Sequence, residues 1–297
     1  MRQIVLPALL LAALGSSAPA QQPASGLQAV LANGYRFAYV ESGAGRPVIL
    51  VHGALGDYRF WDSLRTAGSD SIRFIAYSRR YHAPNPWRPD DPPAGYEASA
   101  ADLAALIRAL RLERPVLVGH SWGGGVALQT ALRFPDLVGG VVLAEPVADS
   151  MIENPVDRAR AADRSRRIYT EALARDPEHQ PESAMRVVVE AWLSEDAWSH
   201  LPPLERERLR DNAHALRSSA SPQPAVSCAT LAQLKVPVLL VGGDASSPRF
   251  RATLDGLEHC LPGARRDTIP AAGHRFPSTH AQDFHEVLTR FVAALPH

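Results

Sequence analysis

The sequence has few cysteines, no excess charge of either sign and, after its first residues, no long apolar run. Its 31 Lys and Arg residues balance 31 Asp and Glu residues, so no general positive field attracts nucleic acid or an anionic membrane surface. The 25 prolines are scattered and form no low-complexity tract. With 46% hydrophobic and 21% charged residues, the chain is predicted to be globular rather than disordered or fibrous. Its 297 residues suffice for one or two domains.

Only two cysteines are present, Cys228 and Cys260. Neither lies in a His/Cys cluster with the spacing of metal ligands, so the sequence implies no metal site. In an oxidising compartment the two cysteines would be expected to form one disulfide. The alternative is two separate buried thiols.

The N-terminus predicts export. Arg2 precedes an apolar run from Ile4 to Leu14, and small residues, Ala18 and Ala20, occupy the positions that a signal peptidase requires. Residues 1–20 are therefore interpreted as a signal peptide, and the protein is expected to be periplasmic or secreted. The alternative is a buried N-terminal strand or helix. Since no other segment approaches the length that spans a bilayer, no membrane contact is expected after cleavage.

From residue 35 to residue 144, strand-like and helix-like segments alternate. Short apolar runs are typical of strands buried on both faces, and longer segments with apolar residues on one side are typical of helices. The expected strands are 35–40, 48–51, 74–77, 115–118 and 138–144, and the expected helices are 99–111 and 122–133. This alternation predicts an α/β fold with a doubly wound, mostly parallel sheet.

After residue 145 the pattern changes to helices alone, expected at 157–175, 184–194 and 203–217. The alternation then resumes, with strands at 236–241 and 265–269 and helices at 249–260 and 280–295. The middle block is interpreted as an insertion. The predicted organisation is a first part of the core at 27–147, a helical cap at 148–228 and a second part of the core at 229–297.

One motif places a serine between an expected buried strand and an expected helix. It is Gly119-His-Ser-Trp-Gly123, in which Ser121 would occupy a tight strand-to-helix turn with strained backbone. Glycines on both sides relieve the crowding. The hydroxyl would then project above the sheet in front of a helix N-terminus, which favours negative charge. The pattern therefore indicates a nucleophile, whereas the alternative is a turn with a serine that only caps the helix.

The chain resembles the α/β-hydrolase family over residues 35–295. Three motifs carry this resemblance: Leu50-Val-His-Gly-Ala-Leu-Gly56, Gly119-His-Ser-Trp-Gly-Gly124 and Ala271-Ala-Gly-His274. The resemblance implies that Ser121 is the nucleophile and that His274 is its base. It also implies that the backbone N–H groups of Ala54 and Trp122 form the oxyanion hole, with His52 and Gly53 shaping that loop.

The triad acid departs from the family's commonest pattern. That pattern places Asp on the loop after the 236–241 strand, but the matching position here is Ser246, with Asp244 nearby. A second family solution places the acid after the strand that follows the nucleophile helix, where this chain has Glu145. We favour Glu145, which would hold His274 in the required tautomer, and keep Asp244 as the alternative.

The chain differs from related families at two further positions, the nucleophile and the segment at residues 78–81. Related epoxide hydrolases and dehalogenases carry Asp where this chain has Ser121, and serine suits acyl transfer instead. Many members have Asp-x-Arg-Gly where this chain has Ser78-Arg-Arg-Tyr81, and Arg80 is expected to brace loops. Tyr81 or His82 at the pocket mouth is a weaker alternative. The aromatic side chains of Trp192 and Trp198 could line a pocket or pack within the cap.

These observations predict a serine hydrolase that cleaves a small to medium carboxylic ester through an acyl-enzyme. The alternatives with the same triad are an amide, as in aminopeptidases, or a carbon–carbon bond, and a non-catalytic binding protein is a third class. No metal or organic cofactor is implied. The expected partner is a small-molecule substrate and no nucleic acid, and the zero net charge fits a neutral substrate. The sequence does not indicate an oligomeric state.

Overall fold

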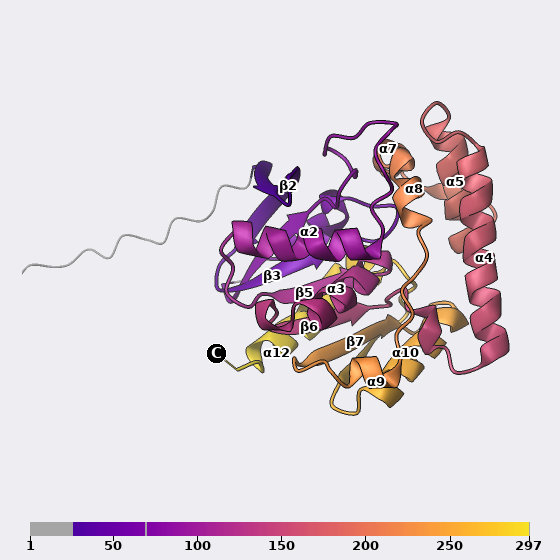
Figure 1. The fold of residues 1–297 in the computed structure, drawn as a ribbon. Helices are drawn as coiled ribbons and strands as arrows, with labels where there is room; N and C mark the ends of the chain where they lie inside the picture. The colour runs from indigo at the N-terminus through magenta and orange to yellow at the C-terminus, as the bar shows by residue number, and fades with distance from the viewer. Residues whose placement is uncertain (1–25, 69, 297) are drawn as a thin grey trace, which may run out of the picture.

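Eight strands form one sheet through the centre of the molecule (Figure 1). The computed structural model describes residues 26–68 and 70–296, so the predicted signal peptide lies outside the described residues. The sheet order is β1-β2-β4-β3-β5-β6-β7-β8, in which β1 pairs with β2 and β2 with β4 antiparallel and all other pairs are parallel. The predicted mostly parallel sheet is therefore confirmed. The strands are β1 (Gln28–Ala32), β2 (Tyr35–Gly43), β3 (Arg46–Val51), β4 (Ile72–Tyr77), β5 (Val116–His120), β6 (Gly140–Ala144), β7 (Val238–Gly243) and β8 (Arg265–Ile269).

The central strands are apolar because helices cover both of their faces. On one face, apolar side chains come from α2 (Tyr96–Ala109), α3 (Trp122–Arg133) and α10 (Pro248–Cys260). On the other face they come from α1 (Asp62–Thr66), α11 (Phe276–Thr279) and α12 (Ala281–Ala293). The sheet is thus doubly wound, as predicted.

The strand register brings the predicted motifs to one edge of the sheet. Val51 of β3 pairs with Gly119 of β5, and Gly119 pairs with Leu143 of β6. The loops after these three strands therefore leave the sheet at the same level. This is the carboxyl edge, where parallel α/β sheets bind ligands.

Helices occupy the chain between β6 and β7, and five of them, from α4 to α8, lie together at one end of the sheet (Figure 1). They pack around their own apolar cluster, which includes Met185, Val188 and Trp198. This agrees with the predicted helical block, whereas the domain boundaries at 148 and 228 stay a prediction. The helices are α4 (Pro155–Ala174), α5 (Pro181–Trp192), α6 (Ala197–His200), α7 (Pro203–Asp211) and α8 (Leu216–Ser219).

The helix expected over 203–217 is interrupted, which corrects that prediction. α7 ends at Asp211, and a 3₁₀ turn (Ala213–Ala215) leads into α8. The cause is the buried Asn212, whose Nδ2 donates to Asp57 Oδ2 at 2.7 Å and whose Oδ1 accepts from Ala83 N at 2.9 Å. These contacts to the core hold residue 212 outside the helical path.

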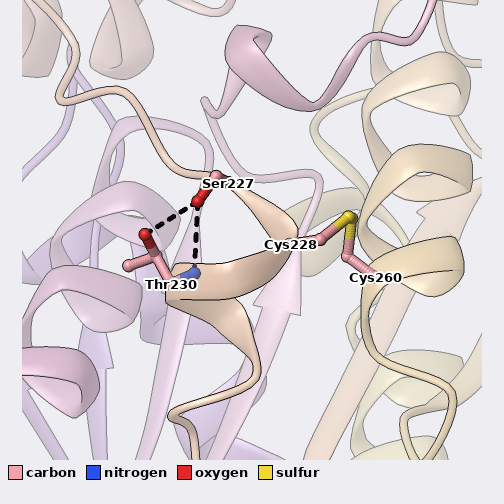
Figure 2. Close-up of a disulfide and its surroundings, with 4 residues drawn as sticks. All are labelled: Ser227, Cys228, Thr230 and Cys260. Atoms are coloured by element: carbon pink, nitrogen blue, oxygen red, sulfur yellow. Dashed lines mark hydrogen bonds between the residues drawn. A yellow bond between two sulfur atoms is a disulfide. The ribbon is translucent and has the colours of Figure 1, made fainter.

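A disulfide joins Cys228 and Cys260 (Figure 2). This bond was expected for a protein exported to an oxidising compartment. Cys228 is the first residue of α9 (Cys228–Leu231), and Cys260 is the last residue of α10. Ser227 caps α9 by accepting from Thr230 N at 3.2 Å. The bond therefore ties the segment that enters β7 to the helix that leaves it, and the alternative of two separate thiols is wrong. No helix within 26–68 or 70–296 has the length and apolar character needed to cross a membrane.

Candidate active site

Ser121 occupies the turn between β5 and α3 with φ 54° and ψ −121°. The left-handed φ is strained for a residue with a side chain. The flanking glycines are required by close backbone contacts, because a Cβ on Gly119 would lie 2.4 Å from Gly123 O and one on Gly123 would lie 2.3 Å from Val51 O. Ser121 N donates to Ala144 O at 3.0 Å, which fixes the turn against β6.

His274 lies on the loop after β8 and is held from several sides. Its Nδ1 lies 2.6 Å from Glu145 Oε2, and its ring stacks on Phe250 with centroids 3.9 Å apart. Its carbonyl oxygen lies 2.8 Å from His120 Nε2. His274 and Ser121 line the same cavity, although no hydrogen bond joins the two side chains in the described structure. Such contacts often tighten only when substrate binds.

Glu145 is the carboxylate that the structure places against His274. Its side chain is 1% exposed, and its Oε1 accepts from Gly243 N at 2.8 Å. The residue has φ 44°, a second strained position at this edge of the sheet. Asp244 is exposed and makes no described contact with His274. The geometry therefore brings together Ser121, His274 and Glu145 and leaves Asp244 outside.

The two expected oxyanion donors also line the cavity beside Ser121. Trp122 is the first residue of α3, so its N–H has no acceptor within the helix. Ala54 lies in the loop after β3, where its carbonyl accepts from Ser219 Oγ at 3.2 Å. Buried His52 accepts from Arg79 N through Nε2 at 3.0 Å. Burial holds the pKa of His52 well below its usual range, so it is neutral, as suits a loop-shaping residue.

The cavity has a volume of about 580 Å³ and lies between the sheet edge and the helical block. Sites for small molecules commonly have this size. Trp192 of α5 lines it, whereas Trp198 is buried in the helical cluster. The two predicted pocket aromatics therefore separate into one lining residue and one core residue.

The residues 78–82 brace the site rather than enter it. Arg80 pairs with Asp102 through Nη2 and Oδ1 at 2.7 Å, as expected for a structural arginine. Tyr81 and His82 do not line the cavity, so the weaker alternative for them is wrong. His82 is fully buried, and its ring lies 4.6 Å from that of His52.

Sequence reasoning missed two arginines of the site. Arg79 is buried against the oxyanion loop, and Arg249 lines the cavity and pairs with Asp149 at 2.7 Å. No motif surrounds Arg249. The double arginine at 79–80 was the only available signal for Arg79. Within 26–68 and 70–296, no group of His, Cys, Asp and Glu could hold a metal ion.

Comparison with known proteins extends this picture. A family model described as "Alpha/beta hydrolase family" matches residues 48–287. The chain is 26% identical over 262 residues to 2-(acetamidomethylene)succinate hydrolase of Mesorhizobium japonicum, covering 86% of this chain and 90% of that protein. It is 38% identical over 127 residues to 2-hydroxy-6-oxo-2,4-heptadienoate hydrolase of Pseudomonas putida, covering 41% of this chain and 45% of that protein.

A solved structure shares the fold. The thermophilic esterase from Thermogutta terrifontis has a TM-score of 0.73 at 22% identity, covering 90% of this chain and 98% of the esterase. The family model spans most of the chain, and the fold and the serine turn agree with it. The chain therefore belongs to the alpha/beta hydrolase family and is a hydrolase.

Proposed function

We propose that the protein hydrolyses small to medium carboxylic esters through an acyl-enzyme on Ser121. The observation that carries this proposal is the 2.6 Å contact between His274 Nδ1 and buried Glu145, at a cavity that Ser121 also lines. A serine, a histidine and an acid in this relation form the constellation that activates a hydroxyl for attack on a carbonyl.

Each proposed step uses a group at this edge of the sheet. Ser121 Oγ attacks the ester carbonyl and gives its proton to His274 Nε2, while Glu145 stabilises the imidazolium through Nδ1. The N–H groups of Ala54 and Trp122 hold the oxyanion. His274 then protonates the leaving alcohol, and the acyl-enzyme forms. A water molecule, deprotonated by His274, releases the acid and restores Ser121.

The reaction is further proposed to occur outside the cytoplasm. The predicted signal peptide at 1–20 supports this location, and the Cys228–Cys260 disulfide is consistent with an oxidising compartment. The substrate is proposed to be a small molecule that enters the cavity without a nucleic acid or membrane partner.

Cleavage of a carbon–carbon bond is the second candidate. The Pseudomonas putida relative, whose name states a 2-hydroxy-6-oxo-2,4-heptadienoate hydrolase, favours it. Carbon–carbon cleavage would use the same serine and histidine. The two candidates are distinguished by comparing turnover of p-nitrophenyl esters with turnover of a vinylogous 1,5-diketone.

The test combines turnover with active-site labelling. A fluorescent phosphonate should label the wild type and fail to label Ser121→Ala, and Ser121→Ala should lose at least about 10⁴-fold in ester turnover because it removes the nucleophile. Glu145→Gln should lose about 10³- to 10⁴-fold, since the histidine loses its orienting carboxylate.

Asp244→Asn is the matched control and should retain wild-type turnover. Loss in Asp244→Asn with normal turnover in Glu145→Gln would refute the assignment of the acid. Labelling of Ser121→Ala would refute the nucleophile. Absence of ester turnover in the wild type would refute the ester proposal and leave the other candidate classes.

A further inference from the structure

Several hydrogen-bond donors in the cavity wall have no partner among the described residues. Three of them are Tyr96 Oη, Arg249 Nη1 and Ser165 Oγ, and each of these atoms is buried. These three residues line the same cavity as Ser121, as do Arg208 and His120, whose Nε and Nδ1 atoms are also buried without a partner. Buried polar atoms in native proteins are nearly always paired, so several such atoms in one cavity indicate a ligand that completes them.

Arg249 is held rigidly by an ion pair, and its Nη1 nitrogen has no hydrogen-bond partner among the described residues. Its Nε and Nη2 donate to the two oxygens of Asp149 at 2.8 and 2.7 Å. Gln223 Nε2 also donates to Asp149, at 3.0 Å, and fixes this carboxylate. The ring of Trp192 lies 4.8 Å from the guanidinium carbon. The remaining nitrogen, Nη1, is therefore oriented before any ligand arrives.

Two tyrosines converge on the same region from different elements. Tyr96 begins α2 and stacks on Trp122 with centroids 4.0 Å apart, whereas Tyr169 comes from α4. Burial raises the pKa of Tyr169 to about 12, and the nearby Arg249 only partly opposes this effect. Burial also raises the pKa of Tyr96, which feels both Tyr169 and Arg249. Both hydroxyls thus stay protonated at neutral pH and can donate.

Arginines outnumber acids in the cavity wall, where Arg158, Arg166, Arg208, Arg249 and Arg275 face Asp57, Asp149 and Glu205. Two of these arginines are also paired with acids just outside the wall, Arg166 with Asp163 and Arg208 with Asp62. Arg158 has no ion-pair partner within the described part of the chain. A guanidinium can only donate, and the orphaned hydroxyls can donate as well. A ligand that matches this wall carries acceptor oxygens and negative charge.

We propose that Tyr96, Tyr169 and Arg249 form a subsite for a carboxylate that the substrate carries in addition to its ester bond. This inference rests on the proposed ester hydrolysis and narrows its substrate class to anionic esters. Charge-assisted hydrogen bonds to a carboxylate are stronger than neutral ones and fix its orientation. The zero net charge of the chain suggested a neutral substrate. We propose an anionic one instead, because the charges in the cavity wall, not the net charge of the chain, determine which substrate binds.

The test compares length-matched esters that differ only in the terminal group. Mono-p-nitrophenyl adipate carries a carboxylate where p-nitrophenyl hexanoate has a methyl group. We expect the wild type to have the higher kcat/KM for the adipate after subtraction of spontaneous hydrolysis. A second pair, 4-carboxyphenyl hexanoate against phenyl hexanoate, places the carboxylate on the alcohol side. The pair that shows the preference identifies which part of the substrate reaches the subsite.

Variants then assign the preference to the subsite. Arg249→Met should lower kcat/KM for the anionic ester about 10- to 100-fold more than for the neutral ester, the range for hydrogen bonds to a charged group. Tyr169→Phe removes one hydroxyl, leaves the Asp149–Arg249 pair intact and should reduce the preference in the same direction. Arg251→Gln, at an exposed arginine of the same helix, is the matched control and should behave as wild type.

Equal turnover of both members of each pair by the wild type would overturn the subsite and leave the ester proposal standing. The subsite is overturned as well if Arg249→Met and Tyr169→Phe lower turnover of neutral and anionic esters alike. Absence of turnover with every ester would instead refute the proposed function itself.

Discussion

At the scale of single residues, Arg79 is a buried cation whose partners are carbonyl groups rather than a carboxylate. It is 1% exposed, and its Nη2 donates to Gly53 O at 3.0 Å while its Nε donates to His52 O at 3.3 Å. Its guanidinium carbon lies 4.1 Å from the centre of the Trp122 ring. Burial lowers the pKa of Arg79 to about 10, which still leaves it charged at neutral pH. It thus joins the two backbone segments that carry the proposed oxyanion donors.

Arg79→Met should therefore lower kcat by about 10-fold or more and change KM little. The apolar side chain fills the space but releases the carbonyls of the loop, and a small misplacement of oxyanion donors costs rate rather than binding. Steady-state kinetics with one p-nitrophenyl ester measure this split, and Arg79→Lys should restore part of kcat. A raised KM with unchanged kcat would contradict the positioning role.

The neighbouring Arg80→Met is the matched control. Arg80 pairs with buried Asp102 and makes no described contact with the oxyanion loop, so its loss should destabilise the fold by about 3–5 kcal/mol with near-normal kcat in the folded fraction. Denaturant unfolding measures the first effect. Equal loss of kcat in the two variants would show that general loosening, rather than Arg79, sets the rate.

What the sequence could predict at this scale follows from how local each signal is. Ser121 and His274 lie in short motifs, and close backbone contacts require the glycines on both sides of Ser121, so both residues could be proposed from the sequence. Glu145 and Asp244 remained alternatives because the contact with His274 spans more than a hundred positions of the chain. Arg249 was missed for the same reason, since its partner Asp149 is distant in sequence and neither lies in a recognisable pattern.

At the scale of secondary-structure elements, the position of a strand could be predicted well where both of its faces are buried. The central strands were predicted within about two residues because both faces are covered and their sequences are continuous apolar runs. The edge strand β1 was missed, since Ala32 is its only buried residue. The break between α7 and α8 was also missed, because it depends on what Asn212 contacts in the core.

The α9–α10 disulfide should stabilise the junction between the helical block and the second part of the sheet. It closes a loop over a sequence separation of 32, for which chain entropy gives about 3–4 kcal/mol. The double variant Cys228→Ser/Cys260→Ser should therefore unfold at lower denaturant concentration while keeping ester turnover at 25 °C. Wild type in excess reductant should shift in the same direction. An unchanged midpoint in both samples would contradict a stabilising role.

At the scale of the whole molecule, three buried histidines are expected to make the fold sensitive to acid. His52 and His82 are fully buried and His120 is 5% exposed. Burial is the main reason that the pKa of each lies well below its usual range, and nearby cations or histidines lower it further. All three are therefore neutral in the folded protein, whereas in the unfolded chain they gain protons below about pH 6.5.

The sign of the effect follows from these depressed pKa values. The unfolded state binds more protons than the folded state below about pH 6.5, so the stabilising contribution is complete above that pH and is lost as the pH falls. Each histidine should lower the free energy of unfolding by about 1.4 kcal/mol per pH unit in that range. Urea unfolding between pH 7.5 and 5.5 should therefore show a steep loss of stability before most carboxylates titrate.

His82→Leu should flatten this dependence. Neither ring nitrogen of His82 has a hydrogen-bond partner of normal geometry among the described residues, and the nearby backbone of Gly56 has the smallest of the effects on its pKa, so the variant should keep most of its stability at pH 7.5. At pH 5.5 it should lose less than the wild type, because one proton uptake on unfolding has been removed. The exposed His259→Gln is the control and should follow the wild-type curve. Parallel curves for wild type and His82→Leu would mean that His82 is protonated equally in both states, and the buried histidines would then not explain the sensitivity to acid.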